Sequence, residues 1–95
     1  MITIEHHHDQ ATVVIAGRFD FRCVKEFHGL LARTSQSWTV DLGRVDYVDS
    51  AALGMLLLLR EHAAGAPVAL LNVRGHVRDV LQLARFDQLF PFEDG

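Results

Sequence analysis

The hydrophobic pattern changes its period along the chain, and each change predicts an element. Apolar and polar residues alternate over residues 2–4, which predicts a short strand. A second run, residues 11–17, is rich in β-branched residues and ends at Gly17, so it predicts another strand. The polar stretch between the two runs suits a turn, and we therefore expect the strands to form a hairpin.

A spacing of three and four residues replaces the alternation after Asp20. This spacing predicts an amphipathic helix over residues 21–33, with Asp20 as its N-cap. The apolar face of this helix consists of Val24, Phe27, Leu30 and Leu31. A polar stretch at residues 34–37 ends the helix, and the apolar segment 38–42 predicts a buried central strand.

The most hydrophobic segment is an unbroken apolar run at residues 55–59. It lies within a second predicted helix, residues 50–64, which follows a predicted loop at residues 43–49 and ends at Gly65. Ser50 is the expected N-cap of this helix, because a serine side chain can accept a hydrogen bond from a free first-turn amide.

The last part of the chain predicts one more strand and one more helix. Residues 68–73 form an apolar run typical of a buried strand, and residues 74–86 have helical spacing. The tail is ambiguous, since residues 87–89 could open a short helix and residues 89–92 could form an edge strand. The resulting order, ββαβαβα, predicts an α/β layer fold with parallel neighbouring strands.

Composition fits one folded domain. The 95-residue chain is 49% hydrophobic and 22% charged, a balance typical of a globular protein with room for a single core. Its formal net charge is −3 and its arginines are scattered, which argues against nucleic acid as a partner. The longest apolar run is too short for a membrane span and the N-terminus lacks a signal pattern, so we expect a cytoplasmic protein without membrane insertion.

Motifs for catalysis and cofactor binding are missing from the sequence. Ser50 stands in Val-Asp-Ser-Ala-Ala, without the two glycines of a nucleophile elbow, so a small serine hydrolase is only a minor alternative. No glycine-rich nucleotide-binding motif occurs, and we expect no cofactor. The three histidines at residues 6–8 fit no metal motif, and the lone Cys23 is expected to serve packing.

Ser50 nevertheless occupies a chemically favourable position. A helix N-terminus carries free N–H groups and a positive partial charge, so it favours a phosphate. Ala51 and Ala52 are small and leave the first-turn amides accessible. Gly54 is costly within a helix and indicates a close approach by a strand or a partner. Ser50 therefore has the properties of a phosphoacceptor as well as those of a simple cap.

Three segments resemble one bacterial family. The segment VDLGRVDYVDSAALGMLLLLREHA, residues 40–63, resembles the signature of STAS domains, the anti-sigma factor antagonists, in which Asp-Ser opens an amphipathic helix. The segment IAGRFDFRCVKEFHGLL, residues 15–31, resembles the family's glycine-containing turn and first helix. The segment VRGHVRDVLQLARFDQLFPF, residues 73–92, resembles its closing helix and tail. The resemblance implies a single STAS domain over residues 1–95.

The resemblance also implies a fold and a role. The fold would be a four- to five-stranded mixed sheet with about four helices. The protein would be a binding module and not an enzyme: unphosphorylated, it would bind an anti-sigma factor or a similar regulator. A serine kinase would phosphorylate it, and a PP2C-type phosphatase would reverse this step. By motif position the phosphoacceptor is Ser50, and the structural glycines are Gly17 and Gly54. The expected partner-binding residues are Asp20, Asp46, Asp49, Ser50, Ala51, Ala52 and Leu53.

Some residues depart from the family pattern. Ala51 and Ala52 stand where the family often has Ser or Thr and then Gly, and Phe19 replaces a leucine. These changes leave Ser50 as the acceptor, and with Asp20, Asp46 and Asp49 beside it we expect an acidic site. The main alternative is a STAS subunit of a lipid-transport ABC complex or of a signalling scaffold, where phosphorylation need not matter.

Overall fold

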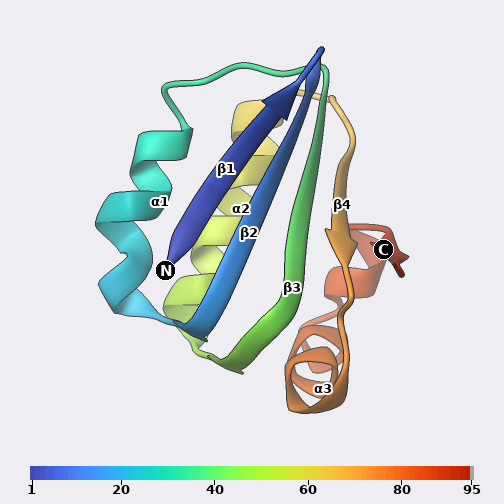
Figure 1. Cartoon of the computed structure of the whole chain (residues 1–95). Helices are drawn as coiled ribbons and strands as arrows, with labels where there is room; N and C mark the ends of the chain where they lie inside the picture. The colour runs from blue at the N-terminus through green and yellow to red at the C-terminus, as the bar shows by residue number, and fades with distance from the viewer. Residues whose placement is uncertain (95) are drawn as a thin grey trace.

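A five-stranded sheet forms the centre of the computed structural model, which describes residues 1–94 (Figure 1). Its strands lie in chain order: β1 (Ile2–His7), β2 (Gln10–Phe19), β3 (Ser37–Val48), β4 (Val68–Leu71) and β5 (Phe92–Glu93). β1 pairs antiparallel with β2, and each later pair of neighbours is parallel. The mixed α/β sheet predicted from the order of the elements is therefore confirmed.

The helices connect the parallel strands. They are α1 (Val24–Leu30), α2 (Ser50–Ala63) and α3 (Gly75–Leu83), and the 3-10 turns η1 (Phe21–Cys23) and η2 (Phe86–Gln88) accompany them. Within residues 1–94 there are thus three α-helices where about four helices were expected. In Figure 1, α2 lies behind β1 and β2 with α1 beside it, and α3 lies beside the lower half of β3.

Burial follows the predicted pattern closely. The inward side chains of the central strands are buried, as in Val13 and Ile15 of β2 and Val40 and Leu42 of β3. They pack against the apolar face of α2, whose buried residues are Ala52, Met55, Leu56 and Leu59. Removing apolar surface from water supplies the main driving force for this arrangement. The result is one contiguous core that joins the inner face of α2 to the sheet.

The prediction of a loop at residues 43–49 is wrong. β3 continues to Val48 and stays paired with β2, and two register shifts absorb its extra residues, one between Val14 and Ala16 and one between Gly17 and Arg18. Such bulges interrupt the alternation that identifies a strand in a sequence. Gly43 permits the first bulge, because a Cβ there would lie 3.1 Å from the Cβ of Asn72 and 3.1 Å from Oδ1 of Asp41.

Three smaller expectations also need correction. The first helical segment ends earlier than residue 33, since α1 stops at Leu30. The tail contains both candidate elements, but the 3-10 turn lies at Phe86–Gln88 and the strand at Phe92–Glu93, because Phe86 and Phe90 are buried in the core. β1 extends through two of the three histidines and reaches His7, so the hairpin turn is shorter than expected.

Candidate functional site

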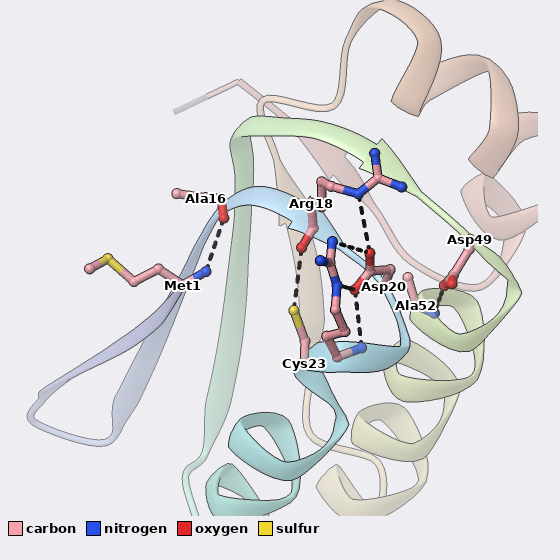
Figure 2. Close-up of polar contacts among 8 residues, drawn as sticks. Met1, Ala16, Arg18, Asp20, Cys23, Asp49 and Ala52 are labelled. Atoms are coloured by element: carbon pink, nitrogen blue, oxygen red, sulfur yellow. Dashed lines mark hydrogen bonds and ion pairs between the residues drawn. The ribbon is translucent and has the colours of Figure 1, made fainter.

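The candidate site lies where β2 and β3 end side by side. Phe19 and Val48 are the last register partners of this parallel pair. The next residue on each strand is an aspartate, Asp20 or Asp49, and each aspartate caps the helical segment that follows it. Parallel pairing thus brings together two loops that are far apart in the sequence, and Figure 2 shows the two capping side chains in one view.

Asp49 is the N-cap of α2, and the expectation that Ser50 takes this place is wrong. Oδ1 of Asp49 accepts a hydrogen bond from the backbone N–H of Ala52 at 3.0 Å, and the Asp49 backbone is extended, as an N-cap requires (Figure 2). Ser50 is therefore the first residue within the helix, and it is exposed. Because Asp49 supplies the cap, the fold does not depend on the Ser50 hydroxyl for this bond.

Asp20 caps η1 and is almost completely buried, with 3% of its surface exposed. Its Oδ1 accepts from the backbone N–H of Arg22 at 3.0 Å, and its Oδ2 accepts from Nη2 of Arg22 at 2.9 Å and from Nε of Arg18 at 3.3 Å. These hydrogen bonds, those of Arg22 above all, lower the pKa of Asp20 from 3.8 to about 2. The carboxylate is consequently ionised at neutral pH despite its burial.

The site is less acidic than the sequence indicates, because two arginines offset part of its negative charge. Arg18 and Arg22 bind Asp20, and the guanidinium carbon of Arg18 also lies 4.0 Å from the ring centroid of Tyr47, its register partner on β3. Sequence reasoning missed both arginines. The signal was present, since each stands two residues from Asp20 in the segment Arg-Phe-Asp-Phe-Arg.

The other predicted partner-binding residues differ in exposure. Asp46 and Ser50 are exposed, whereas Asp49, Ala51 and Leu53 are half-buried. Ala52 is fully buried, so it shapes the first turn of α2 from beneath. Asp41, another acid of β3, instead supports the bulge, where its Oδ1 accepts from the backbone N–H of Gly43 and from Nδ2 of Asn72.

The two predicted structural glycines have different reasons to be glycine. Gly17 has a φ of 81°, a backbone conformation that other residues rarely adopt, and it lies at the second bulge beside the site. Gly54 is exposed within α2, and a Cβ placed there would meet nothing within 4 Å. Among the described residues, no neighbouring strand explains Gly54.

Two apolar side chains near the site are exposed. Phe21 of η1 is 67% exposed, and η1 packs against α2. Leu57 is 42% exposed and follows Ser50 by seven residues, so both lie on the same face of the helix.

Cys23, in contrast, is buried, and its Sγ donates to the carbonyl oxygen of Arg18 at 3.3 Å, which ties η1 to β2.

No metal site or membrane helix is found in the part of the chain that the structure describes. The histidine, cysteine, aspartate and glutamate side chains of residues 1–94 form no group that could hold a metal ion. Within the same residues, no helix combines the length and the hydrophobicity that a membrane span requires. His6 and His7 lie on β1 and His8 lies in the turn, and all three are exposed.

Comparisons with known proteins identify the family. The family model described as "Mlab, STAS domain" matches residues 2–91, so the chain belongs to the STAS domain family. A STAS-domain containing protein of Pseudomonas aeruginosa is 44% identical over 86 residues, which cover 85% of each chain. The resemblance drawn from the Asp-Ser segment is thereby confirmed.

Solved structures share the fold at low sequence identity. An anti-sigma factor antagonist from Mycobacterium paratuberculosis superimposes with a TM-score of 0.86 at 18% identity, over 98% of this chain and 84% of the other. The Bacillus cell fate determinant SpoIIAA in its phosphorylated form gives a TM-score of 0.76 at 16% identity, over 100% of this chain and 91% of the other. These two likenesses show that the architecture is the one found in anti-sigma factor antagonists.

Proposed function

We propose that this protein is an anti-sigma factor antagonist in a bacterial partner-switching pathway, and that Ser50 is its switch. Unphosphorylated, it binds an anti-sigma factor or an equivalent regulator; phosphorylated at Ser50, it releases that regulator. The observation that carries this proposal is the placement of Ser50, exposed in the first turn of a helix whose cap is another residue. The same fold is known in a protein with a phosphorylated form, which supports the proposal further.

The chemistry needs only one group from this chain. A serine kinase transfers the γ-phosphoryl group of ATP to Oγ of Ser50: an O–P bond forms, the bond to the leaving ADP oxygen breaks, and the hydroxyl proton is released to the kinase. A PP2C-type phosphatase hydrolyses the ester and restores the hydroxyl. The new group carries a charge of about −1.5 to −2 at neutral pH. In this scheme the protein itself is a binding module and catalyses neither step.

Release then follows from the cost of burying charge. A partner that covers the first turn of α2 must also cover Ser50, which is exposed there. Burying a phosphate dianion without a partner charge costs several kcal/mol, and about 1.4 kcal/mol corresponds to a tenfold loss of affinity. Because Asp49 and the core hold α2 in place, no refolding is required for this loss. The proposed partner surface comprises Asp20, Asp46, Asp49, Ser50, Ala51, Ala52 and Leu53.

A binding titration against the cognate anti-sigma factor tests the switch. Ser50→Ala should bind as the wild type does and should resist phosphorylation, whereas Ser50→Asp should bind at least tenfold more weakly. Thr34→Ala is the matched control, because it removes another exposed hydroxyl outside the site. Equal binding of Ser50→Asp and wild type would refute the switch.

Two other measurements distinguish the switch from its alternatives, the scaffold role and the serine hydrolase. Incubation with ATP and the cognate kinase, followed by intact-mass analysis, should add one phosphoryl group to the wild type and none to Ser50→Ala. A chain that stays unmodified with every kinase of its partner system would favour the scaffold role, as a subunit of a lipid-transport ABC complex or signalling assembly. Covalent labelling of Ser50 by a fluorophosphonate would favour the serine hydrolase, and we expect none.

A further inference from the structure

Arg18 and Arg22 form a cationic pair around the buried acid Asp20. Both side chains are more than half exposed, at 53% and 60%, although the carboxylate they share is buried. Arg22 uses Nε and Nη2 on Asp20, and Arg18 uses Nε alone. Within residues 1–94, no protein acceptor is found for Nη1 of Arg22 or for either Nη atom of Arg18. Guanidinium donors therefore remain at the surface next to this acid.

The fold brings the loop that carries this pair beside the start of α2. Asp20 and Asp49 directly follow the register partners Phe19 and Val48, and Ser50 is the next residue after Asp49. η1, which contains Arg22, packs against α2, which Ser50 opens. The acid that the two arginines share thus lies in the loop beside the start of α2, the helix that would carry the phosphate.

On the basis of the proposed phosphorylation of Ser50, we infer that Arg18 and Arg22 are a phosphoryl-binding pair. In the unmodified protein they neutralise Asp20; after phosphorylation their free donors, and then Nη2 of Arg22, bind the phosphate on Ser50. A phosphate dianion attracts a guanidinium more strongly than a carboxylate of single charge, and arginine matches phosphate with two parallel hydrogen bonds.

The exchange can occur without disrupting the fold. Asp20 keeps the backbone N–H of Arg22 as a donor even when the guanidinium leaves, so η1 remains capped. Stacking on Tyr47 limits the movement of Arg18, and Arg22 is therefore expected to make the larger rearrangement. The arginines hold the phosphate in a defined position. Their donors are then no longer available on the surface to which a partner of the unmodified protein docks. Phosphorylation would then alter the charge of the docking surface at two points, at Ser50 and at the arginines.

The test uses the full chain with phosphoserine placed at position 50 during translation, so that it needs no kinase. ³¹P NMR follows the phosphate signal as a function of pH. Free phosphoserine titrates near a pH of about 6, and neighbouring cations should lower this midpoint. Arg22→Gln should raise the midpoint by about 1 pH unit relative to the phosphorylated wild type, and Arg18→Gln should raise it by less.

Two further variants make the result specific. Asp20→Asn removes the competing negative charge but retains an oxygen that can cap η1, so it should lower the midpoint, opposite in direction to Arg22→Gln. Arg33→Gln is the matched control, because this exposed arginine follows the far end of α1, and it should leave the midpoint unchanged. Equal midpoints in all of these proteins would overturn the inference, even if a kinase modifies Ser50 in cells.

A last experiment tests whether the arginine pair binds phosphoserine at position 50 specifically or binds any anion. Inorganic phosphate added to the unmodified protein should shift the ¹⁵N signals of the arginine Nε groups much less than phosphoserine at position 50 does. If free phosphate shifted them equally, the pair would be a general anion site and the inference would fail. Loss of regulator binding on phosphorylation with unchanged NMR midpoints would support the switch and reject only the arginine pair.

Discussion

Asp20 and Asp49 are related by the parallel pairing of their strands: each follows one of the register partners Phe19 and Val48, and each caps the helical segment after it. Their surroundings differ sharply. Asp20 is buried between two arginines, whereas Asp49 is half-buried and bonds to a backbone amide. The first aspartate therefore sets the electrostatics of the site, and the second positions the helix start that presents Ser50.

Replacement of Asp49 by alanine should destabilise the protein. The change removes the hydrogen bond to the amide of Ala52, and loss of an N-cap costs about 0.5–2 kcal/mol. For a domain of this size, 1 kcal/mol corresponds to a decrease in Tm of about 4–8 °C. Asp49→Asn should retain most of the stability, because asparagine is an equally good N-cap. Equal melting temperatures for wild type and Asp49→Ala would contradict the assignment of this cap.

Low pH should lower the stability of the folded protein, because it protonates Asp20. The pKa of Asp20 in the folded protein, about 2, lies below its ordinary value of 3.8. Its ion pairs therefore contribute stability that is fully present above a pH of about 4 and is lost as the pH falls toward about 2. Urea denaturation at a series of pH values should show that Asp20→Asn loses less stability over this range than the wild type does. Asp87→Asn, which alters an exposed acid, should behave like the wild type.

The sequence predicts the order of the elements well because most of them bury one regular face. Helix α2 is an example: its apolar run and its terminal Gly65 predict both ends to within a residue. The exact cap could not be predicted, since aspartate and serine are both good N-caps and stand next to each other. The extended backbone of Asp49 and its side-chain hydrogen bond to Ala52 distinguish the two.

Two other features depend on tertiary structure and were missed for that reason. The second half of β3 lacks a regular alternation, because each bulge moves the following side chains to the other face of the sheet. The charge of the site was misjudged because Arg18 and Arg22 act on Asp20 only once β2 ends and η1 turns back. The sequence shows the acidic residues around Ser50 but does not show which of them a cation neutralises.

Gly43→Ala should destabilise the protein, because the new methyl group meets atoms that cannot easily move. Its Cβ would lie 3.1 Å from both the Asn72 Cβ and Oδ1 of Asp41, and this carboxylate also accepts the Gly43 amide. Strain of this kind in a packed region costs about 1–3 kcal/mol. Chemical denaturation monitored by circular dichroism would measure the change. An unchanged denaturation midpoint would show that the bulge relaxes freely.

Gly54→Ala should have opposite effects on stability and on partner binding. The glycine is exposed within α2 and a Cβ there meets nothing within 4 Å, so alanine should stabilise the helix by about 1 kcal/mol. Gly54 lies one turn after Ser50 on the same helix face, and a partner that covers Ser50 therefore approaches this backbone as well. If that approach is close, Gly54→Ala should raise Tm and yet weaken binding of the regulator. Glu61→Ala, an exposed change two turns further along the helix, is the control and should leave binding unchanged. Higher stability combined with undiminished binding would place the partner away from this turn of α2.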